Sequence, residues 1–421
     1  MVEDSGKFFT LDSFDLKGKT VLLRLDLNSP IHPITGEILS ESRLKSHIKT
    51  INDLKLSKVV IMAHQSRPGK SDFIPLKEHS RRLQRLVGRK ITFVDSLFNS
   101  NAINEISKMK DGDILMLENT RFYSEDVSLD TTDYDVLEST NFVRNLSQII
   151  DYFVNDAFPA IHRPQTSLIG FTRLVPNLAG RLIENEITAL DRFLKGNEKP
   201  KIAILGGAKI DDSIAVSKSF LEKNIVKTII AGGVVGNAFL MAKGVNIGKK
   251  NKDFIIKNNK NHDKLISICK ELLEKFTDRI IIPVDSILNP SGKVLNTKES
   301  VPDDEIMADI GPETASIFRE AIGKAKGIFI NGPMGMYEIA EYAGGTLDIF
   351  MAVAEANAIK IAGGGHTISV LESLKVMDKV DHVSTGGGAL ISYLSGEKMP
   401  VLEALKLSYK QFFEDGKIDR K

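Results

Sequence analysis

The sequence has little that would place it outside the cell or in a membrane. It contains a single cysteine, which excludes an intrachain disulfide and favours a reducing compartment. Residues 1–19 carry acidic side chains early and lack an apolar core, so we expect no signal peptide. No uninterrupted apolar run is long enough to cross a bilayer. We therefore expect a cytoplasmic protein without a membrane partner.

An excess of charge of one sign is missing as well. The formal net charge is +1 over 421 residues, so no basic field would attract nucleic acid. The hydrophobic content of 42% and the charged content of 26% are normal for a globular protein. A chain of this length is too long for one hydrophobic core and suits two α/β domains.

Two residue types are unevenly distributed along the chain. Of 16 arginines, 13 lie in residues 1–200, whereas 23 of 32 glycines lie after residue 200. Arginine grips phosphate and carboxylate oxygens with a planar fork, and glycine lets backbone N–H groups approach a nucleotide closely. We interpret the split as two lobes with two kinds of anion site; a drift in composition between domains is the alternative.

Short apolar runs alternate with helix-length amphipathic segments along the whole chain. The expected strands are residues 20–26, 58–64, 113–118, 151–155, 201–206, 226–231, 279–285, 327–331 and 359–363. Continuous apolar strands separated by helices indicate parallel sheets covered on both faces. The predicted fold class is α/β, with two lobes that are each a mainly parallel, doubly wound, Rossmann-like sheet.

The domain boundaries follow from one amphipathic segment, residues 180–195, which is expected to be a helix that joins the lobes. The predicted N-terminal domain is therefore 1–179, and the connecting helix with its hinge is 180–197. The C-terminal domain is predicted at 198–398. The Lys- and Asn-rich stretch 249–260 is expected to be a solvated loop rather than a binding patch.

Polar side chains follow four of the expected strands in the first half. They occur in RLDLNSP (24–30), HQSRPG (64–69), LENTRF (117–122) and NDAF (155–158) with His162 and Arg163 behind it, and Arg43 lies downstream of the first strand. Ligands collect beyond the carboxyl ends of parallel strands. We expect a pocket for a small, strongly anionic ligand. Asp26 and Asn28 would hydrogen-bond a hydroxyl, while the histidines either bind phosphate or are structural.

Glycine-rich turns mark the expected strand ends of the second half. The sequence LGGAK (205–209) follows a strand and opens a helix, which presents N–H donors and the positive end of the helix dipole to a phosphate. The P-loop spacing is absent, and no GxGxxG follows a strand. Five further glycine clusters favour a nucleotide cradle, at 232–233, 309–312, 331–335, 363–367 and 386–388. Lys209, the cation within a glycine motif, is expected to meet a transferring phosphate.

Taken together, these motifs resemble the phosphoglycerate kinase family. The stretches RLDLNSP, HQSRP, LENTRF, NDAF with HR, GGAK, DIGP, NGPMG, GGGHT and HVSTGGGA occur in the order of that family, from about residue 16 to about residue 404. The resemblance implies reversible phosphoryl transfer from 1,3-bisphosphoglycerate to MgADP, giving 3-phosphoglycerate and MgATP. It also implies a hinge-bending, two-lobed enzyme of glycolysis and gluconeogenesis, whose C-terminal segment, 399–421, packs back on the first lobe.

The resemblance assigns residues to both sites. The phosphoglycerate would be held by Asp26, Asn28, Arg43, His64, Arg67, Arg121 and Arg163. The nucleotide would be held by Gly207, Ala208, Lys209, Asn331, Pro333, Glu338, Gly364, Gly365, His366 and Thr367, with Glu338 on the ribose. Arg43 and Lys209 would approach the transferring group as the catalytic cations, and Mg²⁺ would arrive with ADP or ATP.

Two positions depart from the pattern common in bacteria and eukaryotes and look like the archaeal branch of the family. Ser213 stands where that pattern has a second lysine, and His366 stands where it has an aspartate after the glycine triplet. The metal ligands therefore remain open. Asp211 and Asp212 are candidates, and acids favoured by the dipole at a helix N-terminus are the alternative interpretation.

Two other functions compete with this one. A different acyl-phosphate kinase would not need so many arginines for a substrate that lacks a second phosphate. A non-catalytic sensor of nucleotide or phosphometabolite could dispense with Lys209 and Arg43, yet both residues are present.

Overall fold

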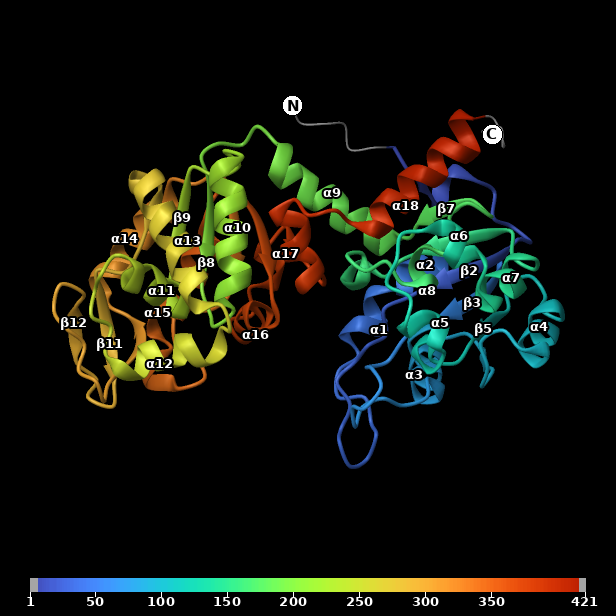
Figure 1. Ribbon diagram of the computed structural model, residues 1–421, viewed down its shortest axis with the longest axis horizontal. Helices are drawn as coiled ribbons and strands as arrows, with labels where there is room; N and C mark the ends of the chain where they lie inside the picture. Colours follow the sequence, from blue (N-terminus) through green and yellow to red (C-terminus); the bar gives the residue numbers. More distant parts are fainter. Residues whose placement is uncertain (1–6, 416–421) are drawn as a thin grey trace. The chain divides into compact units, whose positions relative to one another are not determined.

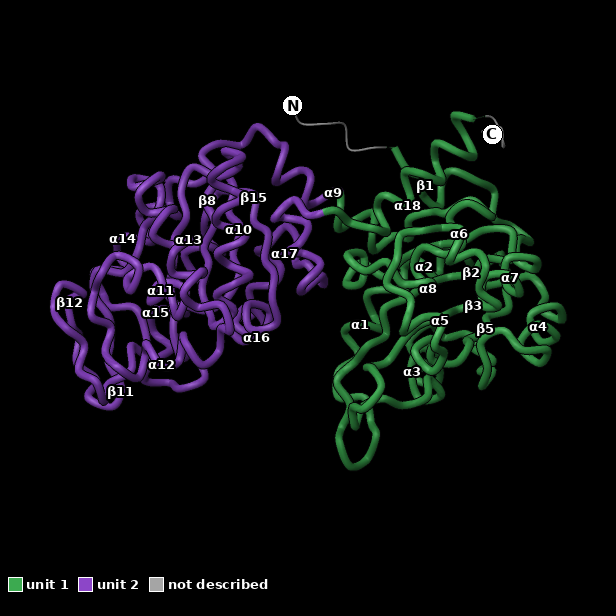
Figure 2. Tube along the Cα trace, in the orientation of Figure 1, with its two compact units in different colours: residues 1–187, 398–421 green, residues 188–397 purple. Residues whose placement is uncertain are grey.

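The structure is a computed structural model that describes residues 7–415. The first residues of the segment 1–19 and the last of the segment 399–421 lie outside the described residues. The chain forms two compact units (Figure 2), one of residues 1–187 with 398–421 and one of residues 188–397. The division falls inside α9 (Arg181–Lys195), which confirms the helix expected at 180–195.

Unit 1 contains a seven-stranded sheet in the order β1-β7-β6-β2-β3-β5-β4, and every pair of neighbours is parallel. The strands are β1 (Phe9–Thr10), β2 (Thr20–Arg24), β3 (Lys58–Met62), β4 (Ile91–Phe93), β5 (Ile114–Met116), β6 (Tyr152–Asn155) and β7 (Asn177–Ala179). Side chains that alternate along these strands are buried on both faces, as continuous apolar runs dictate.

Short helices cover the faces of this sheet (Figure 1). They are α1 (Ser42–Ser46), α2 (Ile48–Asp53), α3 (Lys77–Val87), α4 (Ser100–Ser107), α5 (Ser124–Val127), α6 (Tyr134–Glu138), α7 (Asn141–Ser147) and α8 (Thr166–Ile169). Local sequence sets their ends. The Asn99 side chain accepts a hydrogen bond from the Ala102 N–H at the start of α4, and Gly88 ends α3 in the left-handed conformation.

Unit 2 contains a six-stranded parallel sheet in the order β10-β9-β8-β14-β15-β16. The strands are β8 (Lys201–Leu205), β9 (Thr228–Ala231), β10 (Ile280–Ile281), β14 (Gly327–Asn331), β15 (Ile359–Gly363) and β16 (His382–Val383). The helices are α10 (Ile210–Glu222), α11 (Gly233–Ala242), α12 (Lys249–Asn258), α13 (His262–Lys275), α14 (Pro312–Gly323), α15 (Gly344–Glu355), α16 (Gly365–Ser373) and α17 (Gly388–Ser395). The predicted α/β fold with two parallel sheets is confirmed.

A small antiparallel sheet in unit 2 differs from the expectation. It pairs β11 (Asp285–Asn289) with β12 (Val294–Asn296) and β13 (Ile306–Ile310). The single strand expected at 279–285 is wrong: β10 ends at Ile281, and Asp285 begins a strand of the other sheet. Pro283 lies between them and has no N–H for a ladder, so the main sheet cannot continue through it.

The solvated loop expected at 249–260 is also wrong, because residues 249–258 form α12. Its lysines and asparagines lie among apolar residues, of which Ile255 is fully buried. Asn251 is buried too, and its side-chain amide bonds the backbone at Ile247, Glu305 and Met307. Tertiary contacts of this kind outweigh a low helix propensity.

The C-terminal helix α18 (Pro400–Tyr409) lies in unit 1 beside β7 (Figure 1). The Val401 N–H donates to the Ile161 carbonyl, and the Ser408 hydroxyl accepts from the Asn177 N–H at 2.8 Å. The Tyr409 ring packs on the Phe9 ring with 5.0 Å between centroids. Residues from the two ends of the described chain thereby pack in the same hydrophobic core of unit 1.

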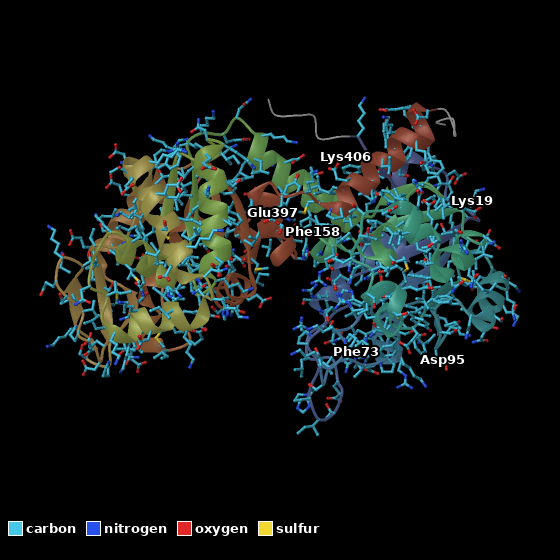
Figure 3. The ribbon with its side chains drawn as sticks, in the orientation of Figure 1. Lys19, Phe73, Asp95, Phe158, Glu397 and Lys406 are labelled. Atoms are coloured by element: carbon cyan, nitrogen blue, oxygen red, sulfur yellow. The ribbon has the colours of Figure 1, made fainter. Side chains whose placement is uncertain are left out.

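We expect Leu405→Ala to lower the free energy of unfolding of unit 1 by about 2–5 kcal/mol, because Leu405 on α18 is fully buried and its loss leaves a cavity. Chemical denaturation measures the change. Lys406→Ala is the matched control on the same helix (Figure 3), since 40% of the Lys406 side chain is exposed and its ammonium group pairs with Glu403. Equal effects of the two substitutions would contradict this packing of α18.

Among residues 7–415, none of the helices combines the length and the apolar composition that crossing a membrane requires.

Candidate functional site

The four polar motifs of the first half meet at one edge of the unit 1 sheet. They follow β6, β2, β3 and β5, which are consecutive neighbours in the sheet and run parallel. Their carboxyl ends therefore lie side by side, as the sequence predicts.

Asp26 and Arg43 form the tightest pair at this edge. Arg43 Nη1 lies 2.5 Å from Asp26 Oδ2, and the Asn28 N–H donates to Asp26 Oδ1 at 3.0 Å. The Asn28 side chain in turn accepts from the Ser66 N–H at 2.9 Å. Asp26 is buried, whereas about a third of the Arg43 side chain (34%) is exposed. One donor of the guanidinium is thus used internally, and others remain for a ligand.

His64 is buried in a group of positive charges. Arg24 Nη2 lies 3.0 Å from His64 Nδ1, and because the guanidinium only donates, Nδ1 accepts and Nε2 carries the proton. Burial holds the pKa of His64 well below its ordinary value, and the charges of Arg24, Arg121, Arg163 and then Arg43 lower it further. His64 is therefore a neutral N–H donor, and four guanidinium groups lie near it.

A cavity of about 440 Å³ opens at the same edge. Its lining includes four residues singled out in the sequence, namely Asn28, Arg67, Arg121 and Arg163. It also includes Ser66 and Pro68, which belong to the HQSRPG motif but were not assigned a role, and Asp72, Val127 and Gln165, which the sequence did not indicate. The lining does not include Asp26, Arg43 or His64. Asn28, which is on the lining, donates a backbone hydrogen bond to the Asp26 carboxylate.

Arg121 is the most constrained cation of this cavity. Burial first, and the charges of Arg163 and Arg24 next, lower the pKa of Arg121 to about 10, so it remains charged at neutral pH. Its Nη1 donates to the Ser66 carbonyl, while its buried Nε has no hydrogen-bond partner among residues 7–415. The Gln165 Oε1 atom on the same lining is also unpaired within that range. Arg121 and Gln165 both line the cavity, although these unpaired atoms are themselves buried within the protein.

In unit 2, the turns after β8 and β14 pack against each other. The Gly206 N–H donates to the Asn331 carbonyl at 2.8 Å, and the Gly207 N–H donates to the Pro333 carbonyl at 2.8 Å. Gly332 has φ +90°, and a Cβ there would lie 2.3 Å from the Gly206 carbonyl oxygen. These glycines are needed for close packing of the turns at the point where the sheet order reverses, which is where doubly wound folds bind ligands.

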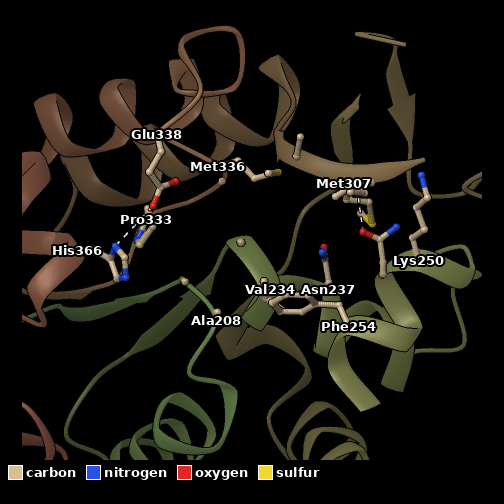
Figure 4. A pocket seen from close by; sticks show the side chains of 16 residues that line it. Ala208, Val234, Asn237, Lys250, Phe254, Met307, Pro333, Met336, Glu338 and His366 are labelled. Carbon is tan, nitrogen blue, oxygen red and sulfur yellow. Dashed lines mark hydrogen bonds and ion pairs between the residues drawn. The ribbon is translucent and has the colours of Figure 1, made fainter. Parts of the chain in front are cut away.

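A cleft of about 330 Å³ lies beside these turns (Figure 4). Five of the predicted nucleotide-binding residues line it: Gly207, Ala208, Pro333, Glu338 and His366. The rest of the lining is largely apolar. Gly233 and Gly335 belong to the predicted glycine clusters 232–233 and 331–335, whereas the sequence did not indicate Val234, Asn237, Lys250, Asn251, Phe254, Ile306, Met307, Ala308 and Met336. A mostly apolar cleft with a few polar groups suits an aromatic base.

Glu338 and His366 meet on the rim of this cleft (Figure 4). His366 Nδ1 lies 3.7 Å from Glu338 Oε1 and 3.1 Å from the Tyr337 hydroxyl. Both side chains are mostly exposed, at 58% for Glu338 and 70% for His366. They therefore remain accessible to a ligand in the cleft.

The other predicted residues lie near the cleft but not on its lining. The Thr367 hydroxyl accepts from the Gly332 N–H at 2.7 Å and so supports the β14 turn. Gly364 packs on Asn331, since a Cβ there would lie 2.4 Å from Asn331 Oδ1. Gly365 begins α16, and a Cβ on it would meet nothing within 4 Å. The N–H groups of this first helical turn have no partner inside the helix.

Lys209 occupies the N-cap position of α10, where its side chain forms no capping hydrogen bond, and it is exposed. Within residues 7–415, no hydrogen bond or ion pair engages its ammonium group. Asp211 and Asp212 lie in the first turn of α10, and burial raises the pKa of Asp212 while the Lys209 charge lowers it. Ser213 is buried and faces the interior. The same residues contain no group of three or more His, Cys, Asp or Glu side chains placed to hold a metal ion.

The cluster 309–312 was expected to belong to the nucleotide cradle, but Asp309 in it has a structural role. Its carboxylate accepts hydrogen bonds from the Gly345 and Ile310 N–H groups at 2.6 and 2.9 Å, and burial raises its pKa to about 6. Gly311 and Pro312 begin α14, whose N–H groups are capped by Asp285. This motif belongs to β13 of the antiparallel sheet, so it does not follow a strand of the six-stranded parallel sheet.

Comparison with known proteins decides the family. A family model described as phosphoglycerate kinase matches residues 11–397. The chain belongs to the phosphoglycerate kinase family.

Named relatives agree over nearly the whole length. The chain is 57% identical to the phosphoglycerate kinase of Thermoplasma volcanium, covering 97% of this chain and 99% of that protein. It is 56% identical to the phosphoglycerate kinase of Thermoplasma acidophilum, covering 96% and 99%. The crystal structure of phosphoglycerate kinase from Pyrococcus horikoshii matches with a TM-score of 0.87 at 38% identity, over 96% of this chain and 100% of that one.

Proposed function

We propose that the protein is a phosphoglycerate kinase that reversibly transfers a phosphoryl group from 1,3-bisphosphoglycerate to MgADP, giving 3-phosphoglycerate and MgATP. The observation that carries the proposal is the pairing of an arginine-lined cavity in unit 1 with an apolar cleft beside helix N-termini in unit 2, in a chain of this family. We place the reaction in cytoplasmic glycolysis and gluconeogenesis, a setting that the single buried thiol, Cys269, suits.

The unit 1 cavity suits a small dianion. Arg67, Arg121 and Arg163 supply permanent positive charge and forked donors for phosphate and carboxylate oxygens. His64 adds a neutral N–H donor that Arg24 orients. Asp26, held by Arg43 and Asn28, would accept from the substrate hydroxyl.

The unit 2 cleft suits a nucleotide. Its apolar side, which includes Val234, Phe254 and Met336, would hold the base, and Glu338 on the rim would accept from a ribose hydroxyl. The first turns of α10 and α16 would meet the phosphates with N–H groups and helix dipoles. The Gly207 N–H already donates to Pro333, so its part would be to allow close approach rather than to donate.

Mg²⁺ would enter as part of the nucleotide substrate. Magnesium commonly keeps several waters and is bound by substrate phosphates with one or two carboxylates. Asp211 and Asp212 at the start of α10 fit that demand, and a larger protein cage is not required.

The transfer itself would need charge neutralisation and positioning but no protein nucleophile. Arg43 and Lys209 would each stabilise charge on the group in flight, one from each unit. The reacting oxygens must come within about 3–3.5 Å of each other. Closure of the two units around the substrates would provide this, and it would exclude water that hydrolyses the acyl phosphate.

A coupled assay with 3-phosphoglycerate and ATP, which follows ADP formation or NADH oxidation, tests the proposal directly. We expect turnover that depends on both substrates. Turnover with another small carboxylate instead would favour a different acyl-phosphate kinase. Binding of both ligands without turnover would favour a sensor.

We expect Arg67→Ala and Arg163→Ala mainly to raise KM for 3-phosphoglycerate and to leave KM for ATP nearly unchanged. Both side chains line the unit 1 cavity, so each substitution removes contacts that the protein would make to the bound anionic substrate in the ground state. Steady-state kinetics with each substrate varied in turn measures the split. Arg144→Ala in the same unit is a control, because Arg144 does not line this cavity. A comparable rise in both constants would contradict the division of the sites.

We expect the radius of gyration to fall only when 3-phosphoglycerate and a nucleotide are bound together. The chain passes between the units twice, through α9 and after Gly396, so both passages are hinge candidates. Small-angle scattering with each ligand alone and with both makes the measurement. A radius that stays constant with both ligands would argue against closure as the step that assembles the site.

A further inference from the structure

A buried histidine that the proposed chemistry does not use lies behind the phosphoglycerate cavity. His47 connects α1 to α2 and is fully buried, although neither the motifs nor the cavity lining include it. Its ring contacts the Asp156 carboxylate on one side and the Asp26 backbone on the other. A buried polar side chain without a ligand role needs a structural or positioning reason.

The hydrogen-bond partners fix the ring's tautomer. His47 Nδ1 lies 2.8 Å from Asp156 Oδ2, and a carboxylate only accepts, so Nδ1 carries the proton. In the neutral ring, Nε2 is then the acceptor for the Asp26 N–H, at 3.2 Å. The Asp26 carbonyl lies at a similar distance, 3.1 Å from Nε2. In the opposite tautomer, Nε2 would therefore donate to the Asp26 carbonyl instead of accepting from the Asp26 N–H, and the position of the Asp26 backbone would change.

The other oxygen of Asp156 holds the connecting helix. Asp156 Oδ1 accepts from the Leu182 N–H at 2.8 Å, in the first turn of α9. The approach is close enough to demand glycine at position 180, because a Cβ there would lie 2.2 Å from Asp156 Oδ1. One carboxylate thus caps α9 and sets the His47 tautomer.

We propose that His47 is a positioning residue that, through Asp156, ties the Asp26 backbone to the first turn of α9. Asp26 in turn holds Arg43 and Asn28 with its carboxylate. The placement of the substrate-side residues and the start of the helix that leads to unit 2 then depend on one buried link. This inference rests on the proposed function for its kinetic consequence, whereas the link itself is independent of the substrate.

Three substitutions cut the link at different points. His47→Asn keeps a donor near the Nδ1 position but loses the contact to Asp26. His47→Gln keeps an acceptor near the Nε2 position but loses Asp156. Asp156→Asn keeps an oxygen for the Leu182 N–H while its amide group becomes a donor toward Nδ1, which reverses the tautomer. Thr50→Val is the matched control, since the Thr50 hydroxyl accepts from the Arg181 N–H in the same turn of α9 but does not contact Asp26.

We expect KM for 3-phosphoglycerate to rise at least about tenfold in His47→Asn and Asp156→Asn, with KM for ATP unchanged, because small misplacement of binding groups is costly. His47→Gln should retain more of the affinity than His47→Asn. Thr50→Val should lower the melting temperature but leave KM for 3-phosphoglycerate as in the wild type. Wild-type affinity in Asp156→Asn, or a Thr50→Val effect equal to that of His47→Asn, would overturn the positioning role.

A spectroscopic readout separates this proposal from the proposed function. In protein labelled with ¹⁵N-histidine, the wild-type His47 should show a protonated Nδ1 and an unprotonated Nε2, and Asp156→Asn should exchange them. A wild-type ring with an unprotonated Nδ1 would overturn the link even if the enzyme is active, because Nδ1 could then not donate to Asp156. The expected tautomer in a protein that fails to turn over 3-phosphoglycerate would instead contradict the proposed function alone.

Discussion

Lys209→Ala should reduce kcat on the order of 10³-fold or more while KM for ATP changes much less. Lys209 is exposed beside the unit 2 cleft at the start of α10, and within residues 7–415 its ammonium group forms no hydrogen bond or ion pair. A cation without a structural partner costs little to remove from the ground state. Its loss is then felt chiefly when charge develops on the transferring group.

Steady-state kinetics in both directions, with MgADP and with MgATP, measures this effect. Lys218→Ala is the control, because Lys218 lies two turns further along α10 and away from its N-terminus. Thermal melts of both variants establish that folding is unchanged. Near-normal turnover of Lys209→Ala at saturating substrate would show that this lysine does not stabilise the transition state.

The parallel architecture could be predicted because it rests on a strong local signal. Continuous apolar runs such as 20–24 and 327–331 read as strands buried on both faces, and polar residues directly after them must meet at one edge. The same argument predicts that Asn28, Arg121 and Arg163 lie close together, and all three line one cavity. It failed at 279–285, where Pro283 divides an apolar run between two sheets.

The apolar wall of the unit 2 cleft could not be predicted in the same way. Phe254 and Met336 look like ordinary core residues in the sequence, and their exposure to a cleft depends on tertiary packing. The signal that was available is Val234, directly after the Gly232–Gly233 turn, where an apolar residue follows a strand end. The bond between His47 and Asp156 spans 109 residues, so no local pattern reveals it.

For some residues the sequence predicts a location at the site but not the chemical state of the side chain. The resemblance placed His64 with the substrate, but only its contact with Arg24 indicates that it is neutral and which nitrogen carries the proton. Arg24 itself stands in the first motif and was not assigned a role, because a fully buried arginine is not expected from sequence. The assignments of ligand contacts to individual residues stay predictions that the substitutions above and below test.

Arg43→Ala should likewise reduce kcat on the order of 10³-fold or more, although Arg43, unlike Lys209, already has a partner in the structure. Arg43 is already paired with Asp26, with 2.5 Å between Nη1 and Oδ2, and a third of its side chain (34%) is exposed. Its fork has donors beyond the one that Asp26 uses, so it can stabilise charge on the group in flight without releasing Asp26. Removing it also leaves the buried Asp26 carboxylate without its cation.

Two further variants separate these contributions. Arg43→Lys keeps the positive charge beside Asp26 but replaces the planar fork with a point charge, so it should bind 3-phosphoglycerate nearly as the wild type does and still lose most of kcat. Lys45→Ala is the control on the same helix, since Lys45 is exposed and lies 3.9 Å from Glu41 in a weak surface pair. Kinetics and calorimetric titration of 3-phosphoglycerate together give the split between kcat and affinity. If Arg43→Lys retains wild-type kcat, or if Arg43→Ala loses only affinity, then Arg43 anchors Asp26 and the ground-state substrate, and the charge in flight is stabilised by other groups.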